Sequence, residues 1–361
     1  MSFFDFNIEK EKYDSQDMYK ILLNFPQQFE DAVDLGKNAP TFPKPLKSKH
    51  FVVLGMGGSA IGADLVKSFL SSLPDSKDIH IFANRNYSID FPLSEETNVI
   101  ASSYSGNTEE TLAAYAEAKK KTKNIVCICS GGKLEELAKE DGFPIIKIPG
   151  GMQPRCAIGY SFFAVFFALK NANIFTSEKT KKVIEESIEE AQSAVKHFVD
   201  TYKDFENSQL QALFSFINGQ KVPIFYTSSE KLHPIAIRLQ NQIQENAKHL
   251  AFVNTLPEMN HNEISAWQLA PELGNQFSVF FITDRDDKEK TKLRTKATKE
   301  ILEKYIPNQL LDLHGNGNSF LARMFNLIVL GDWFSYYFAI LKKQDPTLIP
   351  AITKLKEIMA R

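Results

Sequence analysis

Two segments in the first half of the chain place glycine and hydroxyl side chains where they could bind an anion. The first is residues 55–62 (GMGGSAIG), which directly follow a short apolar run. A glycine-rich turn between a strand and a helix lets the backbone approach an anion closely and points free N–H groups at it. The segment therefore predicts a phosphate site that includes Gly57, Gly58 and Ser59.

The same segment allows two other interpretations. Its spacing also fits the relaxed G-x-G-x-x-A fingerprint of a dinucleotide-binding turn. That fold needs an acidic residue about 20 residues further on, at the end of the second strand, to hold the ribose hydroxyls. The apolar run 79–82 continues into Ala83, Asn84 and Arg85 instead of a carboxylate. Arg85 could serve a 2′-phosphate, so a dehydrogenase remains an alternative, as does a tight turn that binds nothing.

The second segment is residues 102–110 (SSYSGNTEE), at the end of another apolar run. Asn107 followed by Glu110 resembles a helix N-cap and its partner three residues later, so the segment could simply cap a helix. A cap needs one hydroxyl or amide, whereas this segment carries four hydroxyls and a glycine within six residues. Hydroxyls and backbone amides at a helix start suit the three terminal oxygens of a phosphate dianion. The segment therefore adds three residues to the predicted phosphate site, which are Ser103, Ser105 and Thr108.

Predicted strands and helices alternate around both segments. Short apolar runs occur at residues 51–54, 79–82, 99–102, 125–128 and 145–148. Helix-like stretches lie between several of them, at residues 61–70, 109–121 and 134–139. Apolar runs without internal alternation indicate strands buried on both faces, and crossover helices between such strands predict a doubly wound parallel sheet. Both anion-binding segments then fall at the carboxyl ends of strands, where ligands of this fold bind.

The second half repeats the pattern after a helical stretch, residues 155–218. Apolar runs return at residues 222–226, 250–254, 278–283 and 309–313, with helix-like stretches at residues 235–248, 290–304 and 322–341. We therefore expect an α/β protein with two flavodoxin-like sheets. Its predicted parts are a helical lead-in (1–48), a first, phosphate-binding domain (49–152), a helical connector (153–218) and a second domain with a C-terminal helix (219–361).

Composition limits the class of protein. The chain has 361 residues, 43% of them hydrophobic and 24% charged, as expected for a soluble protein of two domains. A net charge of −2 leaves no electrostatic footprint for nucleic acid. The N-terminus carries no secretory signal, and the most hydrophobic stretch, residues 157–169, is shorter than the roughly 20 residues of a membrane span. Cys127, Cys129 and Cys156 match no zinc or disulfide pattern. We expect a cytoplasmic protein with buried cysteines and with neither a membrane nor a nucleic-acid partner.

Several separated motifs resemble one known family. Residues 103–108 (SYSGNT) resemble the phosphate-binding signature of sugar isomerase (SIS) domains. The other matching motifs are residues 55–59 (GMGGS), 154–155 (PR), 244–248 (QENAK) and 261–263 (HNE). Together they make the chain similar to the bifunctional phosphoglucose/phosphomannose isomerases of archaea and some bacteria, from Gly55 to Lys356. The resemblance implies two SIS domains in each chain and a homodimer with a shared active site.

The resemblance assigns a catalytic role to Glu245. In the helix-like stretch 235–248, Ile235, Leu239 and Ile243 form one apolar stripe, and Glu245 falls almost opposite Ile243. This pattern by itself predicts a solvated surface glutamate. By resemblance, however, Glu245 is the base that moves a proton between C1 and C2 of the sugar.

The resemblance also assigns a role to His261. Asn260 and Glu263 look like a helix cap pair, which would place His261 in the first turn of a helix. There the helix dipole disfavours the imidazolium form and keeps the ring neutral near pH 7. By resemblance, His261 acts in ring opening, either in its own subunit or in the partner subunit.

Two basic residues complete the set of expected catalytic residues. Arg155 could be a helix-start arginine in a surface salt bridge, but by resemblance it faces the sugar and stabilises the enediolate, which suits a permanently charged guanidinium. Lys356 resembles the family's terminal lysine, which assists ring opening or contacts the substrate. Lys354 stands two residues away, and the sequence leaves open which of the two lysines reaches the site.

These residues together predict an aldose–ketose isomerase that needs no metal or other cofactor. Its expected reaction interconverts glucose 6-phosphate, and also mannose 6-phosphate, with fructose 6-phosphate through a cis-enediol. One alternative is an SIS-type protein that only senses a sugar phosphate, which would lack Glu245 and His261. The NAD(P)-dependent dehydrogenase is the other. The hexosamine synthases that also contain SIS domains use an N-terminal cysteine nucleophile, whereas residue 2 here is Ser.

Overall fold

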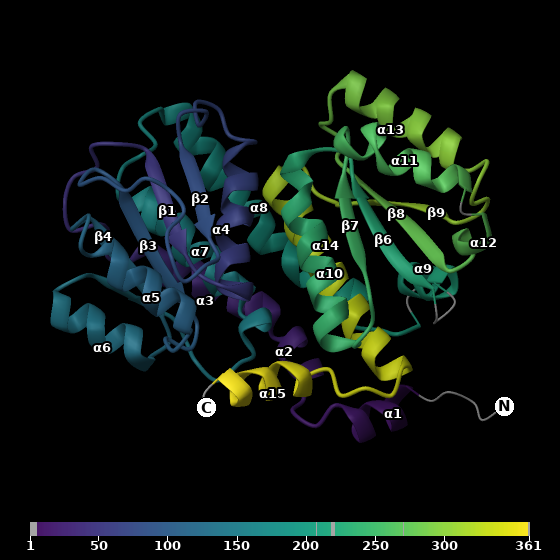
Figure 1. Ribbon diagram of the computed structural model, residues 1–361, viewed down its shortest axis with the longest axis horizontal. Helices are drawn as coiled ribbons and strands as arrows, with labels where there is room; N and C mark the ends of the chain where they lie inside the picture. Colours follow the sequence, from purple (N-terminus) through teal and green to yellow (C-terminus); the bar gives the residue numbers. More distant parts are fainter. Residues whose placement is uncertain (1–5, 207, 218–220, 270, 360–361) are drawn as a thin grey trace. The chain divides into compact units, whose positions relative to one another are not determined.

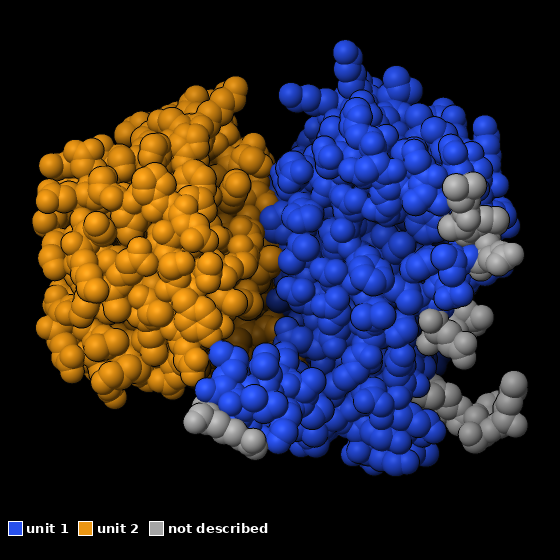
Figure 2. Space-filling view, viewed as in Figure 1, with its two compact units in different colours: residues 1–23, 193–361 blue, residues 24–192 orange. Residues whose placement is uncertain are grey.

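The computed structural model describes residues 6–206, 208–217, 221–269 and 271–359. It divides into two compact units (Figure 2): unit 2 comprises Asn24–Gln192, and unit 1 comprises Met1–Leu23 together with Ser193–Arg361. The division falls within the long helix α8 (Glu178–Tyr202), inside the stretch predicted as a helical connector. The predicted start of the second domain, residue 219, lies outside the described residues.

Unit 2 is built on a five-stranded parallel sheet with the order β2-β1-β3-β4-β5 (Figure 1). Its strands are β1 (His50–Leu54), β2 (His80–Asn84), β3 (Asn98–Ser103), β4 (Ile125–Cys129) and β5 (Ile145–Lys147). Every residue of β3 and β4 is buried, which explains why these strands appear in the sequence as uninterrupted apolar runs. The predicted doubly wound, flavodoxin-like sheet is confirmed.

Helices cover both faces of this sheet. Helices α5 (Glu109–Ala118) and α6 (Gly132–Asp141) lie on one face, where Tyr115 and Leu134 join the buried side chains of β1, β3 and β4. On the other face α4 (Gly57–Leu70) packs on the sheet and on α7 (Ile158–Asn171), which is covered in turn by α3 (Phe25–Lys37). The three cysteines are buried, as expected from the sequence, and none of them is in a disulfide.

Unit 1 contains a four-stranded parallel sheet with the order β7-β6-β8-β9 (Figure 1). Its strands are β6 (Val222–Thr227), β7 (Phe252–Thr255), β8 (Phe277–Thr283) and β9 (Leu310–His314). Each again coincides with a predicted apolar run. The order is that of unit 2 without the last strand, so the predicted repeat of one α/β topology is also confirmed.

The helices of unit 1 pack on both faces of its sheet. Helix α13 (Glu289–Leu302) shares a buried core with Tyr226, Met259 and Trp267 on one face, while α10 (His233–Asn246) and α14 (Phe320–Leu341) pack against each other and against strands of the sheet. The remaining elements of the chain are α1 (Phe6–Tyr13), α2 (Met18–Leu23), α9 (Ser208–Ile217), α11 (Glu263–Ala266), α12 (Pro271–Gly274), α15 (Pro350–Met359), and the 3-10 turns η1 (Pro154–Cys156), η2 (Glu230–Leu232), η3 (Glu258–His261) and η4 (Trp267–Leu269).

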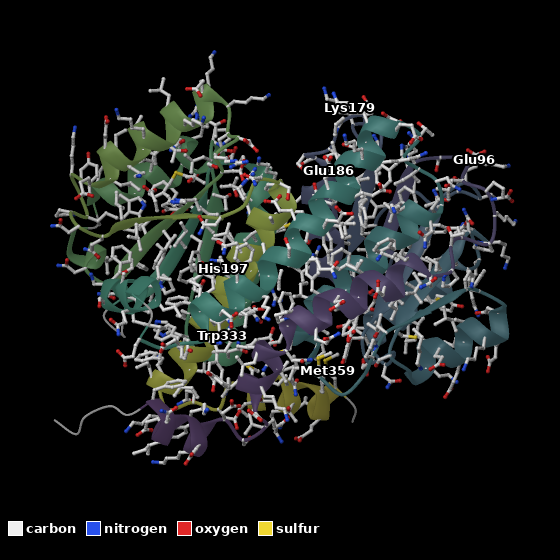
Figure 3. The ribbon with its side chains drawn as sticks, turned by 180° about the vertical axis from the view of Figure 1, so that it is seen from behind. Glu96, Lys179, Glu186, His197, Trp333 and Met359 are labelled. Carbon is white, nitrogen blue, oxygen red and sulfur yellow. The ribbon has the colours of Figure 1, made fainter. Side chains whose placement is uncertain are left out.

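Helix α14 is the central helix of unit 1. By length and composition it could cross a membrane, but 94% of its most apolar window is buried inside the protein. Trp333, near the middle of this helix, is labelled in Figure 3 and is 1% exposed. Such burial is typical of the core helix of a soluble protein.

Candidate active site

The two predicted phosphate-binding turns follow the carboxyl ends of the adjacent strands β1 and β3 in the unit 2 sheet. Strands β1 and β3 are neighbours in the sheet, and the chain leaves β1 through α4 towards β2 but leaves β3 through α5 towards β4. The helices therefore diverge between β1 and β3, which is the topological switch point where open α/β sheets bind their ligands.

The first turn begins α4 and is packed against the segment that carries Arg155. Gly57 has a φ of +47°, which favours glycine. A Cβ on Gly58 would lie 2.9 Å from the carbonyl oxygen of Pro154, so only glycine lets η1 approach this closely. Arg155 is the second residue of η1 and is 5% exposed. The alternative of a surface position for Arg155 is therefore wrong, since η1 packs into unit 2 beside the first turn.

Hydroxyl groups join the first turn to the second. The Ser59 hydroxyl accepts a hydrogen bond from the backbone N–H of Tyr104 at 3.1 Å. The Ser103 hydroxyl accepts from the N–H of Gly106 at 3.1 Å and lies 2.9 Å from the hydroxyl of Thr108. Ser105 is exposed at the tip of the turn. Ser59 thus joins the first turn to the second, in which the hydroxyls of Ser103 and Thr108 contact each other.

The predicted cap pair of Asn107 and Glu110 is wrong. Thr108, not Asn107, is the extended residue that precedes α5, and no described side chain caps that helix. The Asn107 side chain instead accepts a hydrogen bond from the N–H of Lys133 at 3.0 Å, in the first turn of α6. Because Asn107 serves a neighbouring helix, the first N–H groups of α5 remain open to a ligand.

A third turn, between β4 and α6, packs against the hydroxyl turn of residues 103–108. Gly106 has a φ of +71°, and a Cβ there would lie 1.8 Å from the carbonyl oxygen of Gly131. Gly132 has a φ of +75°, and a Cβ there would lie 2.4 Å from the carbonyl oxygen of Ser105. The N–H of Leu134 also bonds the Gly106 carbonyl at 2.9 Å. Two glycines thus let the backbones of the two turns interlock, which fixes the shape of the hydroxyl turn.

The carboxyl ends of β1 and β3 have the features that suit a phosphate. Helices α4 and α5 both begin there without a side-chain cap from any described residue, so each offers backbone N–H groups and the positive end of its dipole. The neighbouring hydroxyls can rotate to donate to an anion. Arg85, the candidate for a 2′-phosphate, forms an ion pair with Asp64 of α4. The arrangement therefore fits a phosphate dianion better than a dinucleotide.

Glu245 lies in unit 1, at the C-terminal end of α10, and is partly exposed. A buried polar network joins α10 to α14 and fixes the rotation of α10. Arg238 donates to both carboxylate oxygens of Asp332 in α14, at 2.7 and 2.9 Å, and Gln242 donates to the same carboxylate at 2.6 Å. Asn246 donates to the Ser335 hydroxyl at 3.0 Å. These contacts hold in place the helix that carries Glu245.

The helix predicted around His261 is not formed. His261 is the last residue of the 3-10 turn η3, and its side chain is exposed. Asn262, not Asn260, caps the following helix α11, through its side-chain oxygen and the N–H of Glu263. Asn260 instead donates to the Thr298 hydroxyl of α13 at 2.9 Å. The helix-dipole argument for a neutral ring therefore does not apply to His261.

The two candidate lysines lie on the exposed helix α15. Lys354 forms an ion pair with Glu357 at 3.1 Å. Within the described ranges, the side chain of Lys356 makes neither a hydrogen bond nor an ion pair. Glu245, His261 and Lys356 thus lie on three separate elements of unit 1, and their roles remain predictions.

In the unit 1 sheet, the turn at the position of the hydroxyl turn binds an internal arginine that was not predicted from the sequence. Strand β8 is followed by residues 284–287 (DRDD), where β3 is followed by the hydroxyl turn. Arg323 of α14, which is 2% exposed, donates to the Asp284 carboxylate at 2.9 and 3.0 Å and also bonds Asp286. Although burial opposes it, the hydrogen bonds and charge of Arg323 hold the pKa of Asp284 below its usual value. The only sign of this network in the sequence was the run of aspartates after β8.

Within the described residues, no group of three or more His, Cys, Asp or Glu side chains is arranged to hold a metal ion.

Proteins of similar sequence and fold span almost the whole chain. Residues 206–359 match the family model of the bacterial phospho-glucose isomerase C-terminal SIS domain. A bifunctional phosphoglucose/phosphomannose isomerase from Caldicellulosiruptor bescii is 37% identical, over 95% of this chain and 99% of that protein. A protein of the same name from Aquifex aeolicus is 34% identical, over 95% of this chain and 98% of that protein.

One relative carries a different name, and one solved structure extends the likeness in fold. A D-glucosamine-6-phosphate 4-epimerase from Sulfolobus acidocaldarius is 33% identical, over 72% of this chain and 75% of that protein. A hypothetical protein from Thermus thermophilus has a similar fold, with a TM-score of 0.74 and 16% sequence identity, over 98% of this chain and 92% of that chain.

Proposed function

This chain belongs to the bifunctional phosphoglucose/phosphomannose isomerase family, and we propose that it interconverts glucose 6-phosphate and mannose 6-phosphate with fructose 6-phosphate. The observation that carries this proposal is the hydroxyl turn of residues 103–108, which lies at the switch point of the unit 2 sheet beside two uncapped helix starts. A phosphate held there would fix one end of an open-chain sugar.

The proposed reaction passes through a cis-enediol. Glu245 removes the proton from C2 of the open aldose and returns it to C1, while a second proton moves from the C2 hydroxyl to the oxygen on C1. The charge that develops on these oxygens is stabilised by the guanidinium of Arg155. His261 and Lys356 assist ring opening. These roles rest on the family resemblance of the motifs that carry the four residues.

Acceptance of both aldoses follows from the same intermediate. Glucose 6-phosphate and mannose 6-phosphate differ only at C2, and removal of the C2 proton gives the same planar enediol from either. Return of the proton to either face of C2 then yields one aldose or the other. We further propose that the enzyme works in the cytoplasm as a homodimer with a shared active site.

Epimerisation at C4 of an amino sugar phosphate is a second candidate, because a relative of similar identity bears that name. The hydroxyl turn would serve either substrate, since it contacts only the phosphate. The two reactions differ at the carbon atoms that exchange hydrogen. Isomerisation through an enediol exposes C1 and C2 to solvent protons, whereas epimerisation at C4 leaves C2 untouched.

The deciding experiment offers the purified protein glucose 6-phosphate, mannose 6-phosphate and glucosamine 6-phosphate separately in D2O. We expect fructose 6-phosphate from the first two, with deuterium at C1 of the ketose and at C2 of the aldose that re-forms from it, both visible by NMR. Glu245→Gln should abolish turnover and still bind the sugar phosphate. Failure to form fructose 6-phosphate from either aldose would refute the proposal, and a C4 epimer of the third substrate would favour the second candidate.

A further inference from the structure

Glu263, the last residue of the 261–263 motif, is fixed to the sheet of unit 1. Its carboxylate accepts hydrogen bonds from the phenol of Tyr226 and from Nδ2 of Asn254, the second at 2.6 Å. Tyr226 and Asn254 are partners in the register of the adjacent strands β6 and β7. One carboxylate therefore ties the chain just after His261 to the carboxyl ends of two strands.

The phenol that binds Glu263 is itself held in place. Tyr226 is 0% exposed, and Nε1 of Trp267 donates to its hydroxyl at 3.0 Å. Burial raises the pKa of Tyr226, and the negative charge of Glu263 raises it further. The phenol therefore stays protonated and donates its hydrogen to Glu263. Hydrogen bonds to an ionised acceptor are about twice as strong as neutral ones, so this attachment is a firm one.

The residues before His261 are anchored as well. Met259 is 0% exposed and belongs to the apolar core under the turn. Asn260 is bonded to Thr298 of α13. Between these attachments and Glu263, the His261 ring is exposed and makes no hydrogen bond within the part of the chain that the structure describes. The backbone on both sides of the histidine is therefore fixed while its ring is left available.

We propose that Glu263 is a positioning residue for His261, which it serves by holding η3 and the start of α11 against strands β6 and β7. The proposal rests on the proposed function, in which His261 acts in ring opening. Glu263 itself does not touch the substrate in this account. Loss of its two hydrogen bonds would leave His261 free to move by about an ångström, a displacement that can reduce turnover on the order of 100-fold.

The kinetic test uses Glu263→Gln with Glu258→Gln as the matched control. Both residues lie in the same segment, but Glu258 is exposed and accepts only a 3.3 Å hydrogen bond from Asn262. We expect Glu263→Gln to lower kcat for glucose 6-phosphate about tenfold or more with KM nearly unchanged. Glu258→Gln should match the wild type. Tyr226→Phe, which removes one of the two donors and keeps the ring, should lower kcat by a smaller factor.

A double variant separates positioning from stability. If Glu263 acts through His261, adding Glu263→Gln to His261→Asn should reduce kcat no further, because the residue to be positioned is already gone. If the two reductions multiply, Glu263 acts by another route and the proposal is wrong. The proposal also fails if Glu263→Gln lowers the melting temperature but leaves kcat unchanged well below that temperature.

An NMR measurement tests the positioning without relying on activity. The ring signal of His261 can be assigned by its loss in His261→Asn and then followed in histidine-labelled protein. We expect Glu263→Gln and Tyr226→Phe to shift that signal, and Glu258→Gln to leave it in place. If the wild type turns over neither sugar phosphate, the proposed function fails, while the His261 signal still decides the positioning. An unshifted signal in both Glu263→Gln and Tyr226→Phe would overturn it.

Discussion

Replacement of Gly106 by alanine is a direct test of the interlocked turns beneath the phosphate site. The residue has a φ of +71°, and its new Cβ would lie 1.8 Å from the carbonyl oxygen of Gly131 and 2.8 Å from the carbonyl carbon. Both are backbone atoms, so no side chain can rotate away to relieve the clash. The backbone of one turn must move.

The expected loss of stability has two parts. The left-handed conformation is unfavourable for alanine by about 1–2 kcal/mol. Forced displacement of a well-packed neighbour adds about 1–3 kcal/mol. Gly106→Ala should therefore lower the free energy of unfolding of unit 2 by about 2–5 kcal/mol.

Gly142 provides a matched control within the same unit. It ends α6 with a φ of +73°, nearly the same as that of Gly106, but nothing lies within 4 Å of the position its Cβ would take. Gly142→Ala should therefore lose only the conformational part, about 1–2 kcal/mol. The difference between the two variants measures the close approach of Gly106 to Gly131.

The measurement combines urea unfolding with substrate kinetics. Both tryptophans, Trp267 and Trp333, lie in unit 1. Their fluorescence therefore reports mainly on unit 1, and the loss in unit 2 should be read from far-UV circular dichroism. Because the hydroxyl turn must shift, Gly106→Ala should also raise KM for the sugar phosphate, while Gly142→Ala should not. Equal losses of stability in the two variants, with equal KM values, would refute this account of the turn.

Two further predictions concern the buried charges of unit 1. Asp332→Asn leaves Arg238 buried with a weaker partner and should lower the free energy of unfolding by about 3 kcal/mol or more, measured by urea titration. The control is Asp312→Asn, which removes a charge from an exposed ion pair and should change the free energy of unfolding by less than about 1 kcal/mol. The second prediction concerns Asp284, whose pKa is lower in the folded protein than in the unfolded chain. Its ion pair with Arg323 therefore stabilises the protein fully above the pKa of an unfolded aspartate, which is about 4. This stabilisation is lost as the pH falls through the lower pKa of the folded protein. Melting temperatures measured between pH 3 and 6 should therefore fall less steeply on acidification in Asp284→Asn, and an unchanged slope would contradict the assignment.

The architecture could be predicted because the determinants of the strands are local. A strand buried on both faces is apolar along most of its length, as β4 (IVCIC) is, whereas the partly exposed strands β7 and β9 contain Asn254 and Asp312 within shorter apolar runs. Turns rich in glycine and serine marked where the strands end. The parallel direction of the strands followed from the connection rules, since two strands joined through a crossover helix run parallel. The order of the strands was not predicted.

The details of the turns could not be predicted, because their hydrogen bonds join residues that are distant in sequence. Asn107 has the spacing of a cap for its own helix, but its side chain bonds Lys133 of the next one. Asn260 likewise bonds Thr298 and leaves the capping of α11 to Asn262. In both places a local rule was correct about the residue type and wrong about its partner.

The two sheets share one topology but differ in the chemistry of the turn at the same position. After β3 the turn offers hydroxyls and open amides, so an anion has donors available and no carboxylate within residues 103–108 to repel it. After β8 the same position carries residues 284–287 (DRDD). Asp284 and Asp287 are buried there, and a buried carboxylate needs a positively charged partner. Arg323 supplies that cation from within the protein. The turn after β8 is therefore satisfied internally, whereas the turn after β3 has hydroxyls and amides available for the proposed phosphate. In the proposed function, phosphate binding is accordingly assigned to unit 2, and unit 1 contributes Glu245 and His261.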